Sequence, residues 1–513
     1  MVVTNFPWLT VLVALPAAGA ALLGFVPPLR RAAGRVIALV IALVELAIGV
    51  YAAATVFDWS APASYQLYES RAWIPQIGVT WSVAVTSLGL VMILLALALV
   101  PLVLIAGWDE NEDRGAYPAL VLALQAFMVL IFAAFDLAVF YFAFEAMLIP
   151  LYFMIGRYGV GDEAARHKAA MKFLLYSLFG GLIMLGGVLF IWALGSSTQS
   201  NTVAFFRMDT LAALLPNLSA SVQMVVFVSF MVAFAIKAPM VPVHTWLPDT
   251  AAVARPGTSV LLVGVLDKIG FFGMITMCLQ LTPGASASAK WAMCVLAVIS
   301  ILWGGLSANG QNDIMRLVSH TSVSHFGFMV LGIFIGSEIA LVGAMFYMVA
   351  HGVSIAAMFL LSGWLSKRGG TQDMRDYVGM QRVTPVLAGL WLMSGLASIA
   401  LPGLSGFVPE YLVLMGTWTV SGPLALFAVL GVVIAAMYIL MPYQRVFTGA
   451  PGKGKEDLAD LGARERGVMT PLVVAMLVLG IWSAPLVSAL TPVAQDLGLT
   501  HSQVGATAEG SVQ

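Results

Sequence analysis

The sequence predicts an all-α polytopic membrane protein with about fourteen transmembrane helices. Of its 513 residues, 61% are hydrophobic and 10% are charged, whereas soluble globular chains carry about 25% charged residues. No polar stretch is long enough to form a soluble domain. The net charge of −1 provides no basic surface for nucleic acid. Composition therefore excludes a soluble protein and a nucleic-acid-binding protein.

Apolar runs of membrane-spanning length make up most of the chain, since about 20 apolar residues cross a bilayer as a helix. Polar residues, proline and glycine separate fourteen such runs. They begin near Pro7, Arg35, Trp81, Tyr117, Leu137, Lys168, Val222, Ser259, Lys290, Ile314, Glu338, Pro385, Pro423 and Gly467. The first run has basic residues after it rather than before it, which is the reverse of a cleaved signal peptide. We therefore expect it to remain in the protein.

The distribution of Lys and Arg predicts the orientation, because cytoplasmic loops carry an excess of both. Of the 24 Lys and Arg residues, Arg71, Arg207 and Lys290 lie in loops after even-numbered runs, and Lys237 and Lys268 lie inside runs. The other nineteen belong to loops after odd-numbered runs. This asymmetry supports the count of fourteen and predicts that both termini lie outside the cell.

Two runs contain breaks. The seventh is interrupted at residues 237–242, and the twelfth at 401–406; broken membrane helices persist only where protein or water covers the freed backbone. Grouping runs four to eight and nine to thirteen places each break fourth in a unit of five, so the second unit must be inverted. We expect an N-terminal three-helix segment at 1–116, a first five-helix unit at 117–281, a second, inverted unit at 282–446, and a cytoplasmic loop, last helix and external tail at 447–513.

Several charged residues lie inside the apolar runs, and four of them are candidates for a functional site. Charges at the middle of a membrane cost about 2.5–3.5 kcal/mol each on insertion scales, so they mark functional sites by default. Glu145 needs a cationic partner to ionise; Lys237, beside the first break, is the natural one, and Lys268 is the next candidate. Glu410 lies on the second broken run. A carboxylate and an ammonium in one dry site titrate together and can act as a proton switch, whereas the alternative is a static ion pair that fixes helix packing.

Histidines supply a possible relay between these charges. His325 on the tenth run and His351 on the eleventh lie in apolar surroundings, and the pKa of an ordinary histidine, about 6.5, suits proton transfer near neutral pH. They could carry protons between Lys268 and Glu410, or they could be hydrogen-bonded core histidines. Glu45, on the second run, lies outside both five-helix units and is a candidate for contact with another subunit.

Metal and thiol chemistry are not expected in this chain. Cys278 and Cys294 each lie inside an apolar run, which disfavours a disulfide, a zinc site or an iron–sulfur cluster. No His, Asp and Glu side chains share helical spacing suited to a metal within a membrane run. We therefore expect no cofactor and no metal here.

Four segments resemble the antiporter-like membrane subunits of bacterial respiratory complex I, the NADH:quinone oxidoreductase. They are residues 144–150 (FEAMLIP), 169–177 (AAMKFLLYS), 235–249 (AIKAPMVPVHTWLPD) and 322–327 (SVSHFG). The likeness runs from about Tyr117 to Arg445. Within that family, Glu410 and a length of 513 residues resemble the M type. In two places the chain departs from the pattern: Asp267 precedes Lys268 where an apolar residue is usual, and Pro409 precedes Glu410 where glycine is common.

The resemblance implies proton translocation driven by quinone reduction elsewhere in the complex. Glu145 and Lys237 would be the coupled pair, Lys268 the central relay and Glu410 the terminal site toward the outside. FMN, iron–sulfur clusters and quinone would bind partner subunits, and the partners would include neighbouring antiporter-like subunits in the bacterial cell membrane. Because adjacent residues do not face each other on a helix, we expect Asp267 to point to another neighbour than Lys268.

Two other functions remain open from the sequence. A subunit of a multisubunit sodium/proton antiporter can also carry Glu at the position of Glu410, and it would form a complex without redox centres. A structural membrane anchor would hold the same charges as static ion pairs, and neutralising Lys237 would then leave pumping intact.

Overall fold

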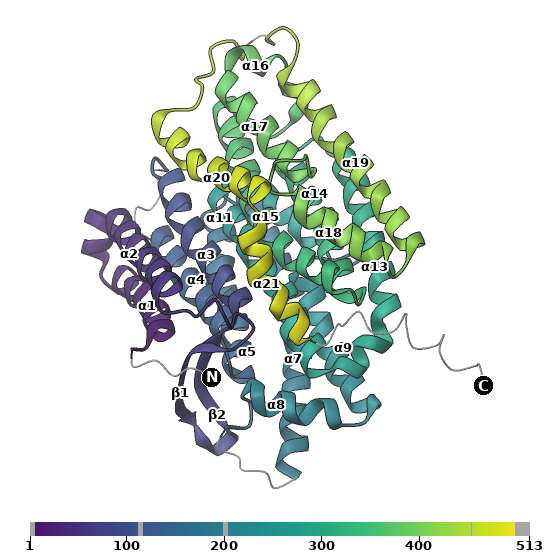
Figure 1. The fold of residues 1–513 in the computed structure, drawn as a ribbon. Coiled ribbons are helices and arrows are strands. Elements are labelled where there is room, and N and C mark those ends of the chain that lie inside the picture. The colour runs from purple at the N-terminus through teal and green to yellow at the C-terminus, as the bar shows by residue number, and fades with distance from the viewer. Residues whose placement is uncertain (1–5, 111–115, 198–203, 453, 498–513) are drawn as a thin grey trace, which may run out of the picture.

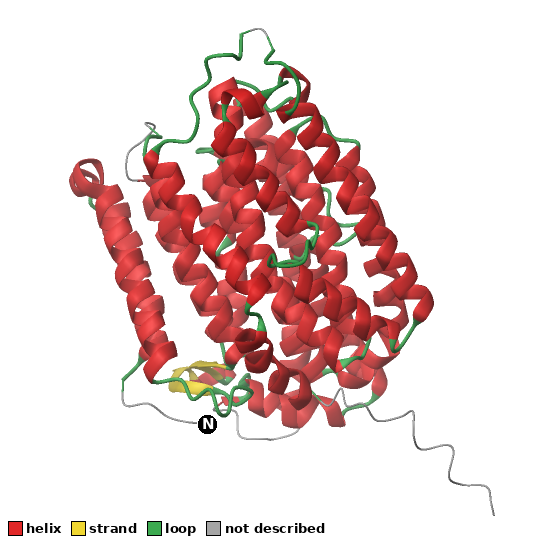
Figure 2. Ribbon diagram, turned by 45° about the horizontal axis from the view of Figure 1, so that its top comes forward, coloured by secondary structure: helices red, strands yellow, loops and turns green. Residues whose placement is uncertain are grey.

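The protein is a bundle of long, roughly parallel and antiparallel helices with a small hairpin at one end (Figure 1). The structure is a computed structural model, and it describes residues 6–110, 116–197, 204–452 and 454–497. The strands, yellow in Figure 2, lie at the end opposite to the short helix α16 of Figure 1. We refer to these two ends as the hairpin end and the α16 end. The expected all-α polytopic membrane architecture is confirmed.

The first half of the chain contains ten α-helices and one β-hairpin among its described residues. They are α1 (Trp8–Phe25), α2 (Pro27–Thr55), β1 (Gln66–Ile74), β2 (Val79–Val85), α3 (Ser87–Ala106), α4 (Ala116–Ala133), α5 (Leu137–Ala146), α6 (Leu148–Gly156), α7 (Glu163–Ser197), α8 (Met208–Leu214), α9 (Ala220–Lys237) and α10 (Trp246–Val253).

The second half contains helices and connecting loops, with no named strand in the part that the structure describes. Its helices are α11 (Pro256–Leu261), α12 (Lys268–Gly273), α13 (Pro283–Asn309), α14 (Ile314–Phe334), α15 (Glu338–Gly369), α16 (Met380–Val383), α17 (Pro385–Ser398), α18 (Phe407–Trp418), α19 (Gly422–Phe447), α20 (Ala463–Ile481) and α21 (Ala484–Asp496). Two π-helical segments, Leu262–Leu266 and Met274–Leu279, flank α12 and join it with α11 into one continuous span.

Twelve helices in the described residues are long and apolar enough to cross a membrane. A thirteenth span is the pair α20 and α21, which bends by 68° where Pro485 opens the first turn of α21. The short helices α17 and α18 lie on either side of the non-helical residues 399–406. The described residues thus contain twelve to thirteen spans, close to the expected number of about fourteen.

Both predicted breaks are present. Helix α9 ends at Lys237, and its last carbonyls are satisfied by local donors: Ala238 N–H donates to Phe234 O at 2.7 Å, and Met240 N–H donates to Ala235 O at 3.0 Å. Figure 2 shows green, non-helical segments inside the bundle. Backbone freed from a membrane helix is stable only when it is satisfied in this way.

Polar contacts join loops that the Lys and Arg distribution places on the same side of the membrane. At the α16 end, Arg255 Nη1 lies 2.7 Å from Glu110 Oε2, and Arg464 pairs with Asp109. At the hairpin end, Asp136 Oδ2 accepts the backbone N–H of Thr80 at 2.9 Å. If the sequence analysis had missed or added a span before one of these loops, loops predicted to lie on opposite sides of the membrane would contact each other.

Three sequence expectations need correction at the N-terminal end. The third span begins at Ser87, because the alternating segment Val79–Val85 forms strand β2 and pairs with β1. No charged residues separate this strand from the helix, so hydropathy alone assigns both to one apolar run. The second span begins at Pro27, so the arginines up to Arg35 lie within its first turns. Glu45 is 0% exposed on α2, which packs against α3 and α4, so it does not present a charge to another subunit.

The centre of the bundle is formed by α14 and α15. In the apolar, membrane-spanning stretches of these two helices, 94% and 100% of the residues are buried, compared with 28% in α2 and 33% in α19. Helix α13 approaches α14 through glycine: a Cβ at Gly304 would lie 2.5 Å from the backbone N of Ser324, and one at Gly327 would lie 2.6 Å from Ala297 O. These contacts are backbone to backbone and cannot be relieved by a side-chain rotation.

We expect Gly304→Ala to destabilise the protein by about 1–3 kcal/mol, the usual effect of overpacking, because α13 must move away from α14. Gly186→Ala on α7 is the control, since a Cβ there meets nothing within 4 Å and alanine is the better helix former. Thermal stability of the purified protein, followed by the loss of the monodisperse size-exclusion peak, would compare them. Equal stability of the two variants would contradict the close approach.

Candidate functional site

A chain of buried polar side chains runs through the centre of the bundle across α12, α15, α14 and α18. Lys268 Nζ lies 2.8 Å from His351 Nδ1. The ring of His351 faces that of His325, with 5.4 Å between centroids. His325 Nδ1 lies 2.8 Å from the hydroxyl of Tyr347, which donates to Glu410 Oε2 at 2.7 Å. All five side chains are buried.

The donors in the second half of this chain all point the same way. Because Tyr347 donates its only hydroxyl proton to Glu410, its oxygen must accept from His325, which therefore carries its proton on Nδ1. The other nitrogen of that ring, Nε2, lies 3.2 Å from the hydroxyl of Tyr438 and 3.5 Å from Ser398 Oγ. The hydrogen bonds thus run in one direction from His325 to Glu410.

The sequence interpretation missed both tyrosines. Tyr347 precedes His351 by four residues on α15, so the two side chains share one helix face; that spacing was a usable signal. Tyr438 is on α19 and meets His325 across 113 residues of sequence. No local pattern indicates that contact.

Lys268 is held by two further contacts. Its ammonium donates to the backbone carbonyl of Val263, in the π-helical segment that precedes α12. It also lies over the ring of Phe326, 5.0 Å from the centroid. Widening of the helix in a π segment changes which carbonyls are available, so this segment supplies an acceptor that a regular helix would not.

Lys237 lies in an aromatic pocket at the C-terminal end of α9. Its Nζ is 5.6 Å from the centroids of both Phe144 on α5 and Phe173 on α7. Among the described residues it has no hydrogen-bond partner. Cation–π contacts of this kind stabilise a desolvated ammonium by about 2 kcal/mol, so the rings partly replace the counter-ion that the sequence leads one to expect.

Glu145 lies beside this pocket but is only half-buried. It fills a notch in α7, because a Cβ at Gly181 would lie 1.6 Å from Glu145 Oε1. Ser177 shares the α7 face of Phe173 and Gly181, at four-residue spacing. It therefore lies between the residue that contacts Lys237 and the residue that contacts Glu145, and its hydroxyl is buried with no partner in the described part of the chain.

The expected pair of Glu145 and Lys237 thus shares a region without forming an ion pair in contact. The two groups interact electrostatically, yet Lys237 Nζ and Glu145 Oε1 both lack hydrogen-bond partners among the residues described. A second carboxylate, Asp267, also interacts electrostatically with Lys237. Buried polar groups left unpaired by protein are the places where ordered water is expected.

A cluster of charged and imidazole side chains follows the first break toward the α16 end. Asp249 Oδ2 lies 2.7 Å from Lys172 Nζ, and its other oxygen pairs with Arg316. The rings of His244 and His320 lie nearby, 6.3 Å apart. The indole N–H of Trp246 donates to Ile236 O at 3.0 Å, which fixes the second half of the broken helix against the first.

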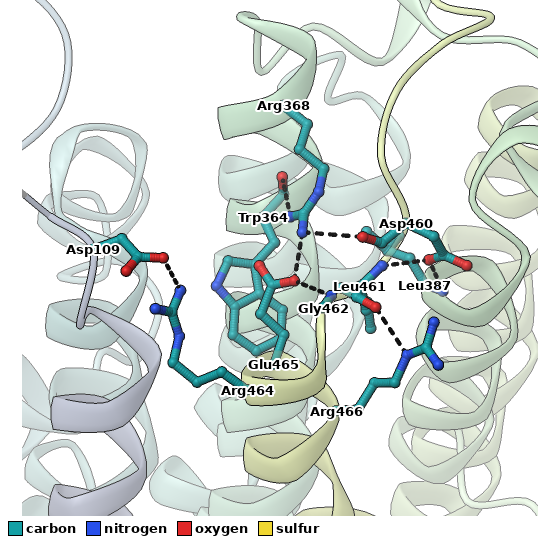
Figure 3. A network of polar contacts seen from close by, with 10 residues as sticks. All are labelled: Asp109, Trp364, Arg368, Leu387, Asp460, Leu461, Gly462, Arg464, Glu465 and Arg466. Carbon is teal, nitrogen blue, oxygen red and sulfur yellow. Dashed lines mark hydrogen bonds and ion pairs between the residues drawn. The ribbon is translucent and has the colours of Figure 1, made fainter.

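Figure 3 shows a separate polar network at the α16 end that fastens α20 to the bundle. Arg368 on α15 pairs with Glu465, and Arg464 pairs with Asp109. The hydrogen bond from Arg464 holds the pKa of Asp109 below its usual value. Asp460 accepts two backbone N–H groups at the start of α17, at 2.8 and 3.0 Å. These contacts are ties between helices and lie outside the central polar chain.

No group of three or more His, Cys, Asp or Glu side chains in the described residues is arranged to hold a metal ion. Cys278 and Cys294 are buried free thiols.

Comparison with known proteins identifies the family. A sequence model described as NADH:quinone oxidoreductase/Mrp antiporter, TM, matches residues 134–435. NADH-quinone oxidoreductase subunit M of Mycobacterium tuberculosis is 40% identical over 530 residues, which cover 97% of this chain and 95% of that protein. Subunit M of Rhodobacter capsulatus is 34% identical over 462 residues, 89% of each.

Solved structures agree with this assignment. A chain of respiratory complex I from Thermus thermophilus matches with a TM-score of 0.85 and 30% identity, covering 96% of this chain and 99% of that one. A chain of the Mrp complex from Dietzia sp. matches with a TM-score of 0.82 over 96% and 98%, but at 21% identity this likeness shows the fold alone. The chain belongs to the NADH:quinone oxidoreductase/Mrp antiporter transmembrane family, and its full-length likeness to subunit M proteins places it with the M-type members.

Proposed function

We propose that this chain translocates protons as a membrane subunit of a bacterial NADH:quinone oxidoreductase. The observation that carries the proposal is the buried polar chain from Lys268 to Glu410, because ionisable side chains inside a membrane bundle are costly and mark ion pathways. The relatives named NADH-quinone oxidoreductase subunit M support the enzyme to which it belongs.

Each sequence-derived site residue has a role in this proposal. Glu145 and Lys237 are the coupled pair that responds to charge in the rest of the complex. Lys268 is the central relay, with His351 as its hydrogen-bonded neighbour. Glu410 is the terminal site.

A proton moves from His325 to Glu410 through Tyr347 in balanced steps. When His325 takes up a proton at Nε2, it becomes a cation that holds protons on both nitrogens. Its Nδ1 proton then passes to the oxygen of Tyr347 across 2.8 Å, while the hydroxyl proton of Tyr347 passes to the Glu410 carboxylate across 2.7 Å. His325 is neutral again, Tyr347 keeps one proton, and Glu410 has gained one.

The step between the two histidines differs from the others, because their rings are stacked at a tilt rather than hydrogen-bonded. His351 Nε2 has no partner in the described structure, and the ring centroids are 5.4 Å apart. A ring rotation or one water molecule closes such a gap. This step is therefore the natural place for control of the proton's passage.

In this proposal, the free energy of quinone reduction in partner subunits drives proton movement here through changes in the charge of buried groups. In a medium of low dielectric constant, a change of charge at one buried group alters the proton affinity of its neighbours. The electrons, FMN, iron–sulfur clusters and quinone belong to partner subunits in this proposal, which include neighbouring antiporter-like subunits.

The orientation and the internal units are part of the proposal. The excess of Lys and Arg places the α16 end in the cytoplasm and the hairpin end outside the bacterial cell membrane. Both termini would then be external, although residues 1–5 and 498–513 lie outside the described residues. Segments 117–281 and 282–446 would be the two inverted five-helix units, each with one broken helix, between the N-terminal segment 1–116 and the C-terminal segment 447–513.

We expect Glu410→Gln to lower the initial rate of NADH-driven proton uptake by about tenfold or more, since removal of a positioned proton-transfer group has at least this effect. The change removes the acceptor at nearly constant volume. Proton uptake and quinone-dependent NADH oxidation would be measured in the same inverted vesicles. Pumping at the wild-type rate would remove Glu410 from the pathway, and a purified complex without flavin and iron–sulfur subunits would favour the sodium/proton antiporter instead.

Tyr347→Phe should also reduce proton uptake per NADH oxidised, because it removes the hydroxyl that joins His325 to Glu410 and leaves the ring in place. Tyr443→Phe is the matched control: this tyrosine stacks on Trp391 and Phe447, away from the polar chain. Proton-to-electron ratios in vesicles would distinguish the variants. An unchanged ratio in Tyr347→Phe would show that protons take another route.

A further inference from the structure

Asp267, directly before α12, is a buried carboxylate outside the chain of hydrogen bonds from Lys268 to Glu410. It is 0% exposed, and neither of its side-chain oxygens has a hydrogen-bond partner among the described residues. An ionised carboxylate in this condition is strongly destabilising unless cations lie close to it. The surroundings of Asp267 therefore decide what it does.

The backbone places Asp267 at the contact between α12 and the first helix break. A Cβ at Gly270 would lie 2.6 Å from the Cβ of Ala238 and 2.7 Å from Phe234 O, so this face of α12 touches the end of α9. Asp267 precedes Gly270 by three residues and shares that face. Its carboxylate is accordingly directed toward the segment that begins with Lys237.

The opposite face of the same span touches α15. A Cβ at Gly264 would lie 3.5 Å from Gly352 O, and Lys268 reaches His351, the neighbour of Gly352, from this side. The π-helical segment Leu262–Leu266 ends immediately before Asp267, whose N–H donates to Leu262 O at 3.0 Å. One short segment thus presents a carboxylate to α9 and an ammonium to α15.

Asp267 stands electrostatically between the two lysines. Its charge interacts with both Lys237 and Lys268. Without it, two ammonium groups would share a water-poor region with only aromatic rings, carbonyls and a distant carboxylate around them. Like charges in low dielectric repel strongly, and the carboxylate of Asp267 favours the charged form of each lysine.

We propose that Asp267 is a proton-carrying site that links the Lys237 pocket to the polar chain beginning at Lys268. The inference rests on the proposed function. In this assignment the proton moves through bridging water, because the carboxylate hydrogen-bonds to neither lysine. One N–H bond of a charged lysine breaks as one O–H bond forms on Asp267. That O–H bond then breaks as an N–H bond forms on the other lysine, which is neutral before it accepts the proton.

The first test compares two isosteric variants of fully buried, unpaired carboxylates in the assembled complex. Asp267→Asn should lower NADH-driven proton uptake by about tenfold or more, with NADH oxidation retained in uncoupled vesicles. Glu45→Gln is the matched control, because Glu45 is also 0% exposed with two unpaired oxygens but lies on α2, away from the central chain. Asp267→Glu should recover part of the pumping, since it restores a carboxylate with a longer reach.

Several outcomes separate this inference from the function itself. Wild-type pumping in Asp267→Asn, together with loss of pumping in Lys268→Gln, would overturn the inference and leave the proposed function standing. Wild-type pumping in both would overturn both. Equal losses in Asp267→Asn and Glu45→Gln would show a general effect of buried charge, and would also overturn the inference.

Failure of Asp267→Asn to assemble is resolved by a double variant. If assembly fails because two ammonium groups are left unbalanced, Asp267→Asn with Lys237→Gln removes one charge of each sign and should restore the complex, but without proton uptake. A double variant that assembles and pumps would contradict the inference. A double variant that still fails to assemble would assign Asp267 to packing alone, which overturns it equally.

Discussion

The desolvation of ionisable side chains is the constraint on which the rest of this structure depends. Water is scarce inside a membrane bundle, so a charge there must find its stabilisation in protein. The chain solves this differently at each site: Lys268 uses an imidazole and a backbone carbonyl, Glu410 uses a tyrosine hydroxyl, and Lys237 uses two aromatic rings. Each solution leaves the group able to gain or lose a proton, which a closed ion pair would resist.

The helix irregularities follow from the same constraint. A regular helix satisfies all its backbone groups internally and offers none to a side chain. The break after Lys237 opens a turn whose carbonyls accept from local N–H groups and from the Trp246 indole. The π-helical segment before Asp267 contains the carbonyl to which Lys268 donates. Irregular backbone therefore occurs where polar side chains need acceptors, and it is covered by protein at both places.

Ion pairs at the α16 end tie separate parts of the chain together. Arg368 pairs with Glu465 and so joins α15 to α20. Arg255 pairs with Glu110 and so joins the start of α11 to the loop after α3. Such ties between helices help to hold the hydrogen-bonded side chains at the centre of the bundle in position.

By itself, the sequence determined the membrane class, the approximate number of spans, both breaks and the ionisable residues Glu145, Lys237, Lys268 and Glu410, because hydropathy, proline and charge are local properties of the chain. Only the tertiary structure decided which side chains meet. It inserted Tyr347 between His325 and Glu410, turned Asp267 toward the end of α9, and separated Glu145 from Lys237. Such contacts join residues on different helices, often many tens of positions apart, and they depend on how each helix is rotated and where it crosses its neighbours. Helical periodicity specifies a face, but the partner of that face is set by the packing of the whole bundle.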